Sequence, residues 1–149
     1  MLRLFDLPAH PLLIHFPIVA IPTLSIIAVV MALRPTFRTR YGIAATLLGL
    51  LTTVATFFAA SSGQALSEDF GLTEEFIGKH QSLGETLRIF VLGLTITVLS
   101  MTAVERRIAE SRHPAAILSS VGAIALAVLS LVWVIRTGHE GARSVWGGF

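Results

Sequence analysis

The chain contains no cysteine. This absence excludes disulfide bonds, zinc sites built from thiolates, iron–sulfur clusters and the covalent attachment of c-type haem. It does not identify a compartment, because helices embedded in lipid need no disulfide bonds to stay together.

Charged residues are also scarce. They make up 13% of the 149 residues, whereas soluble domains carry about 25%. Hydrophobic residues make up 54%, and the mean hydropathy is +0.79. This composition predicts an integral membrane protein.

Four apolar stretches are each long enough to cross a hydrocarbon core, which takes roughly 20 residues. They cover residues 11–33, 42–61, 83–104 and 114–135. Three of them carry no formal charge, and the third carries only Glu85 and Arg88, near its start. The first stretch is too long for a signal peptide and no small-residue cleavage site follows it, so we expect it to be retained as a span.

Inside a bilayer, backbone polar groups must be satisfied within each segment, so the four spans are expected to be helices. The sequence therefore predicts an all-α fold, an antiparallel bundle of four transmembrane helices that forms one domain over residues 1–149. The first and third connections are short, so the spans they join should form helical hairpins.

Small residues recur every three or four positions on the second and fourth stretches. They are Gly42, Ala45, Gly49, Thr52, Thr56, Ala59 and Gly63 on one, and Ala116, Ser119, Ala123, Ala127 and Ser130 on the other. Such faces let helix backbones approach closely in lipid. We expect them to pack within the chain, with a homodimer interface as the alternative.

Arginines beside the spans predict the orientation. The two short connections hold Arg34, Arg38, Arg40, Arg106, Arg107 and Arg112, whereas acidic residues dominate the opposite side. This pattern predicts a bacterial inner-membrane protein whose N- and C-termini are periplasmic. It also explains the pI of about 9.9 without a nucleic-acid partner.

Four of the five histidines flank span ends that this topology puts on the periplasmic side. We predict a shared site in which His10, His15, His80, His139 and Arg88 bind a cofactor, and in which His15, His80 and His139 ligate a metal. His10 is the least secure member, because it precedes a proline and its ring could instead cap the helix. The fifth, His113, lies on the other side and is expected only to start a helix.

Helix one should be distorted near these residues. Pro17 and Pro22 cannot donate backbone hydrogen bonds, which predicts a kink. Five residues of regular helix turn through about 140°, so the rings of His10 and His15 would otherwise point to different sides. Irregular backbone at membrane depth is tolerated where it lines a cavity, which fits a site beside His15.

The third span has two possible starts. Ser82 followed by Glu85 matches a capping box, whereas Thr73 could cap a longer helix that puts His80 and Arg88 on one face. We favour the longer helix. Arg88 is expected either to pair with Glu85 or to bind an anionic ligand group.

The fourth span is expected to end at Gly138, with His139 immediately outside the helix. Trp146 and Phe149 would then be interfacial anchors.

Three motifs resemble those of a known family. They are HPLLIHFP at the start of the first span, a histidine that opens the third, and TGHEGARSVWG after the fourth. Over nearly the whole chain, they resemble a bacterial family of small four-helix membrane proteins catalogued as a domain of unknown function. The resemblance implies that His10, His15, His80 and His139 form one site. It also implies an association with redox modules, because related domains occur fused to cytochrome-like segments.

Imidazoles without nearby sulfur ligands suit haem iron, copper(II), zinc or non-haem iron. Histidines on facing helices can be axial haem ligands, with Arg88 or Arg136 meeting the propionates. We therefore expect haem b and electron transfer, with a quinone or a redox protein as partner. The alternatives are a transition-metal ion (Cu, Zn or Fe), or a non-redox structural subunit or small-molecule carrier. No general acid, base or nucleophile is visible, so the sequence does not decide whether the protein is an enzyme.

Overall fold

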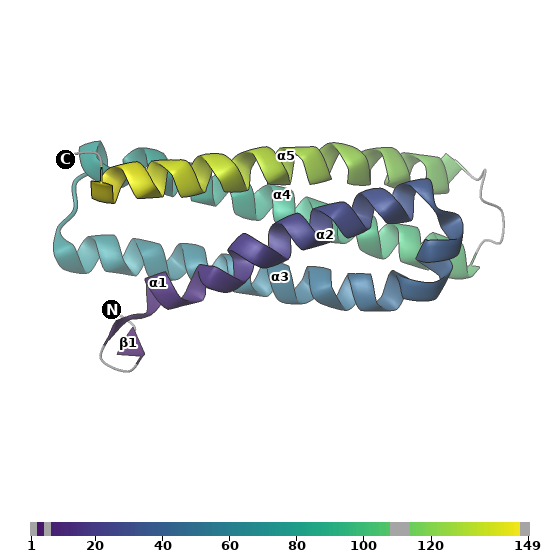
Figure 1. The fold of residues 1–149 in the computed structure, drawn as a ribbon, viewed down its shortest axis with the longest axis horizontal. Coiled ribbons are helices and arrows are strands. Elements are labelled where there is room, and N and C mark those ends of the chain that lie inside the picture. The colour runs from purple at the N-terminus through teal and green to yellow at the C-terminus, as the bar shows by residue number, and fades with distance from the viewer. Residues whose placement is uncertain (1–2, 5–6, 108–113, 147–149) are drawn as a thin grey trace.

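The computed structural model describes residues 3–4, 7–107 and 114–146, nearly all of them helical. The helices are α1 (Ala9–Leu13), α2 (His15–Leu33), α3 (Pro35–Phe70), α4 (Glu74–Arg107) and α5 (Pro114–Trp146). Two short antiparallel strands, β1 (Arg3–Leu4) and β2 (Leu7–Pro8), precede them. The four long helices run side by side in one elongated bundle (Figure 1).

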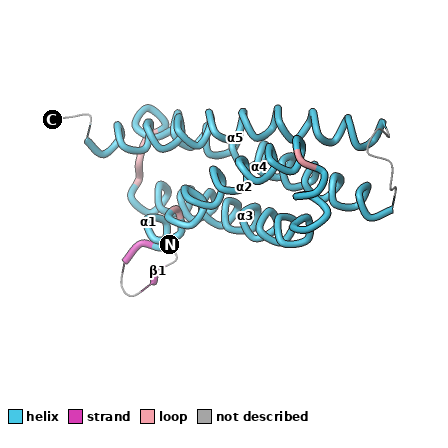
Figure 2. Tube along the Cα trace, turned by 45° about the vertical axis from the view of Figure 1, so that its right-hand side comes forward, coloured by secondary structure: helices cyan, strands magenta, loops and turns pink. Residues whose placement is uncertain are grey.

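Four segments are long and apolar enough to cross a membrane, with α1 and α2 together forming the first (Ala9–Leu33). This confirms the predicted all-α bundle of four membrane helices. Both ends of the chain lie at the same end of the bundle (Figure 1). The connection between α3 and α4 also lies at that end, and the one between α2 and α3 lies at the other (Figure 2). Which end faces the periplasm stays a prediction.

The helices extend well beyond the predicted spans. Arg38 and Arg40, which were expected in a connection, lie inside α3, and only Arg34 separates α2 from α3. At its far end α3 continues to Phe70 and stops at Gly71, whose φ of 59° is left-handed. Glycine adopts this conformation without strain, so it suits the end of a helix.

The longer of the two possible starts of the third span is confirmed. Helix α4 begins at Glu74, and the backbone N–H of Phe76 donates to the carbonyl of Thr73. Ser82 lies inside the helix, where its hydroxyl donates to the carbonyl of Lys79. It therefore does not cap the helix.

The expected helix end at Gly138 is wrong, because α5 continues to Trp146. A glycine within a helix costs only about 1 kcal/mol, and contacts to a neighbouring helix can offset this. Glu140 of α5 accepts from Lys79 of α4 at 2.6 Å, and the hydroxyl of Ser144 donates to the carbonyl of Phe76 at 3.4 Å. His139 therefore lies within the helix.

The first membrane segment is distorted near its start, as the prolines predicted. Helix α1 ends at Leu13 and α2 begins at His15, with Ile14 between them. Pro17 has no N–H to donate to the carbonyl of Leu13, which accounts for the break at this point. Pro22 is accommodated inside α2.

The small-residue faces pack inside the bundle, as predicted. The buried residues of α5 are Ala116, Ser119, Ala123, Ala127 and Ser130. On α3, a Cβ added at Gly42 or Gly49 would lie 2.9 Å or 3.1 Å from a side-chain atom of Thr102 or Thr95, respectively. These close approaches join α3 to α4.

Candidate functional site

The described histidines fall into two classes. His10 and His80 are partly buried and line a cavity of about 550 Å³ at the end of the bundle where the termini lie. His15 and His139 are exposed and do not line it. His113 lies outside the described residues.

His10 is held by the end of helix α3. Its Nδ1 lies 2.9 Å from the carbonyl oxygen of Ala59 and 3.2 Å from the hydroxyl oxygen of Ser62. Because a carbonyl oxygen can only accept, Nδ1 carries the proton and donates it. In the neutral form of this ring, Nε2 of His10 then holds the lone pair.

His80 is held in the same way by the end of helix α5. Its Nδ1 lies 2.9 Å from the carbonyl oxygen of Thr137 and donates to it. In the neutral form of this ring, Nε2 of His80 is then the lone-pair atom. The two histidines therefore share one tautomer.

Each of these rings also lies against a glycine. A Cβ at Gly63 would be 2.8 Å from Cε1 of His10, and a Cβ at Gly141 would be 2.9 Å from Cε1 of His80. Real Cβ atoms essentially never approach so closely, so a larger residue would push the ring away. Glycine at both positions lets the rings lie close to the neighbouring helices.

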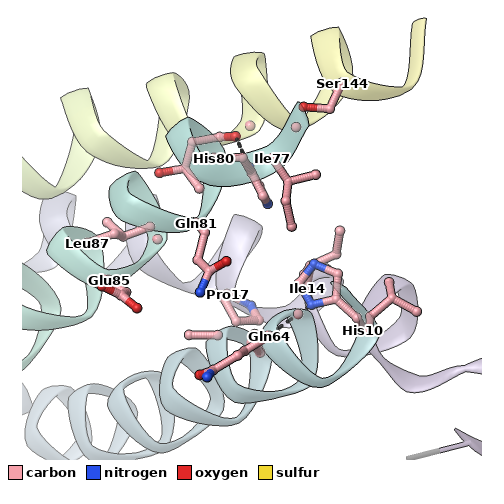
Figure 3. A pocket seen from close by; sticks show the side chains of 18 of the residues that line it. His10, Ile14, Pro17, Gln64, Ile77, His80, Gln81, Glu85, Leu87 and Ser144 are labelled. Carbon is pink, nitrogen blue, oxygen red and sulfur yellow. Dashed lines mark hydrogen bonds between the residues drawn. The ribbon is translucent and has the colours of Figure 1, made fainter. Parts of the chain in front are cut away.

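The two rings point toward one another from opposite walls of the cavity (Figure 3). Their centroids are 6.4 Å apart, and their planes are inclined at 79°. Neutral imidazoles oriented by Nδ1–H donation to backbone carbonyls are the usual form of metal-ligating histidine. The pair can thus present two nitrogen lone pairs to one bound ligand.

The rest of the cavity is mainly apolar. Ile14, Pro17 and Leu87 contribute to its walls, and the amides of Gln64 and Gln81 add polar groups (Figure 3). Cavities of this size and composition are typical of sites for small molecules and cofactors.

Arg88 also lines the cavity, beside Glu85. Its Nη2 lies 4.0 Å from Oε1 of Glu85, and its guanidinium carbon lies 5.6 Å from the ring centre of Phe57. At 31% exposure, the Arg88 side chain is only partly covered. It therefore keeps hydrogen-bonding capacity for an anionic group in the cavity.

The histidine grouping differs from the one predicted. Within residues 3–4, 7–107 and 114–146, no group of three or more His, Cys, Asp or Glu side chains is arranged to hold a metal ion. The predicted ligand set of His15, His80 and His139 is thus not brought together. His10 takes the place opposite His80 instead.

The sequence reasoning also missed part of the site. Gly63 was assigned only to a packing face, and neither Gly141 nor the two glutamines was singled out. The sequence alone did not mark these glycines, because Ala59 and Thr137, the carbonyl acceptors one helical turn before them, are identified only by the structure.

Comparisons with known proteins agree with the membrane fold. No curated protein and no solved structure matches the chain. The model of the family DUF2231, described as a predicted membrane protein, matches residues 6–148. This match covers most of the sequence, and it bears out the resemblance to a membrane family of unknown function. The chain therefore belongs to the DUF2231 family of predicted membrane proteins.

Proposed function

We propose that the protein binds haem b between His10 and His80 and transfers electrons at the periplasmic face of the bacterial inner membrane. The observation that carries the proposal is the opposed pair of imidazoles on the cavity walls, each with Nδ1 held by a backbone carbonyl. Haem b, when bound, supplies a one-electron redox couple.

The donor chemistry supports haem. A porphyrin would bring four nitrogen ligands to its iron, so the protein would need to add only two. His10 and His80 supply that number, and Nδ1 of each is engaged with a backbone carbonyl. Structural zinc sites, in comparison, usually take four protein ligands.

The distance between the rings of His10 and His80 also supports haem. Bonds from histidine nitrogen to a metal ion are about 2 Å long, so two imidazoles on opposite sides of one ion have ring centres roughly 6 Å apart. The centroids of His10 and His80 are 6.4 Å apart. If the chain supplied both protein ligands to the iron, electron transfer would be favoured over the binding of a gaseous ligand.

The chain's own residues have three tasks in this proposal. The two histidines would hold the iron, and apolar wall residues such as Leu87 would exclude water. Arg88 is the cation available to a propionate, since it lines the same cavity. A quinone or a periplasmic redox protein would exchange electrons at this end.

The periplasmic location rests on charge. Arg34, Arg38, Arg40, Arg106 and Arg107 lie at the end of the bundle opposite the cavity. Arginine-rich ends of membrane helices face the cytoplasm. The cavity end would therefore face the periplasm.

The first test is the absorption spectrum of the protein purified from membranes, together with its metal content. A Soret band that shifts on reduction with dithionite supports haem. Colourless protein that contains stoichiometric copper, zinc or iron would instead support a bare metal ion between the two imidazoles. Protein with neither would contradict both and favour a structural subunit or small-molecule carrier.

A further inference from the structure

The two halves of the chain share a pattern of buried residues. The difference in residue number between His10 and His80 recurs along the helices that follow them. The same offset relates Pro17, Ile21, Leu24, Ser25, Ala28 and Met31 of α2 to Leu87, Val91, Leu94, Thr95, Val98 and Met101 of α4, and every one of these residues is buried. The inward faces of α2 and α4 therefore match position by position.

Helices α3 and α5 correspond in the same manner. A second constant offset relates Arg38, Ala45, Gly49 and Thr52 of α3 to Ala116, Ala123, Ala127 and Ser130 of α5, all buried. The same offset relates Gly63, which lies against the ring of His10, to Gly141, which lies against the ring of His80. It also relates Ala59 to Thr137, whose carbonyl oxygens accept from His10 and His80, respectively.

The packing has the same regularity. Helix α3 contacts α2 and α4, while α5 contacts α4 and α2, so the helices form a closed ring of two hairpins. Helices α2 and α4 both run away from the cavity end, and α3 and α5 both return to it (Figure 1). A half-turn about an axis along the bundle would exchange the hairpins.

We infer that the chain is a tandem repeat of one helical hairpin, and that the ligand lies across the pseudo-two-fold axis between the copies. Each copy contributes one imidazole, one carbonyl that fixes its tautomer and one glycine that fixes its position. Gly63 and Gly141 are positioning residues. The identity of the ligand rests on the proposed haem function, whereas the repeat does not.

Two departures from the symmetry stand out. The hydroxyl of Thr95 donates to the carbonyl of Gly49 at 3.0 Å, whereas its counterpart Ser25 is buried and has no hydrogen-bond partner among the described residues. At the cavity, the position that corresponds to Arg88 is Ile18. The site thus offers two equivalent imidazoles but a cation from one copy only, which suits a metal centre with an acidic substituent.

The test compares the two halves directly. Nitrogen-15 NMR of histidine in the ligand-free protein should show His10 and His80 in the same Nδ1–H tautomer. Gly63→Ala should shift the ring signals of His10, and Gly141→Ala those of His80. Gly122→Ala is the matched control, because a Cβ there would lie 3.3 Å from Thr97, away from the cavity, and should leave both rings unchanged.

Hemin titration gives the second readout. Changes in groups that orient metal ligands typically cost 10- to 100-fold in affinity. Gly63→Ala and Gly141→Ala should each weaken hemin binding by about this factor, and to a similar extent, whereas Gly122→Ala should not.

The outcomes separate the repeat from the function. Matching tautomers without hemin binding would refute the haem proposal and support the repeat. Hemin binding with different tautomers, or with sensitivity to only one of the two cavity glycines, would overturn the equivalence of the halves. The tautomer measurement uses the unaltered protein, so it decides the question even if a variant fails to fold.

Discussion

Arg38 and Glu105 form a buried ion pair at the end of the bundle opposite the cavity. Nη2 of Arg38 lies 2.6 Å from Oε2 of Glu105, and the two side chains are 3% and 20% exposed. Thr39 donates to the other carboxylate oxygen at 3.0 Å, and Arg38 also reaches the hydroxyl of Ser120. These contacts link the first turns of α3 to the end of α4 and the start of α5.

Removal of one member should destabilise the protein strongly. A buried charge that loses its partner typically costs about 3–5 kcal/mol, so Arg38→Gln and Glu105→Gln should each lower the free energy of unfolding by about this amount. The measurement is denaturant unfolding in detergent micelles. Thr36→Ala, at an exposed position of the same helix, should change it little.

The double replacement of Arg38 by Met and Glu105 by Leu should cost less than either single change, because no unpaired charge stays buried. If the double variant loses as much free energy of unfolding as the two single variants together, Arg38 and Glu105 are not energetically coupled.

Single cysteines can establish the topology, since the chain has none of its own. A cysteine at exposed Thr73, between α3 and α4, should react with a membrane-impermeant maleimide in intact spheroplasts. A cysteine at exposed Thr36 should react only after lysis. The reverse pattern would put the cavity on the cytoplasmic side.

Arg88 should tune the bound haem. A positive charge near the iron favours the reduced state, so Arg88→Gln should lower the midpoint potential and weaken haem retention. Arg88→Lys keeps the charge but loses the planar fork, so its potential should change less. Glu85→Gln is the control, because it removes the 4.0 Å ion pair with Arg88 but keeps the positive charge of the arginine. If all three variants match the unaltered protein in potential and haem content, Arg88 is only a partly covered surface residue.

Much of the fold could be predicted from the sequence, because span length and the spacing of small residues are local properties. The buried positions of α5, such as Ala123 and Ser130, follow directly from that spacing. The helix ends could not be predicted so well. Gly138 ends many helices by local preference, but here Glu140 and Ser144 bond to α4 and the helix continues.

The histidine site was only half predictable. Its place at the end of the bundle with the termini followed from the order of the spans. Which histidines line the cavity depends on the rotation of each helix about its axis, and residue spacing alone does not determine that rotation. The break at Ile14 leaves His15 exposed, and continuation of α5 keeps His139 on the helix surface. The pairing of His10 with His80 needed the packing of α1 on α3.

The proposal that His10 and His80 together ligate haem is tested most directly by the absorption spectra of the four histidine-to-alanine variants. His10→Ala and His80→Ala should each lose haem or open an axial position that binds carbon monoxide after reduction, which the unaltered protein should not do. His15→Ala and His139→Ala, the exposed controls, should keep the full spectrum. Loss of haem from either control while His10→Ala retains an unchanged spectrum would contradict the claim.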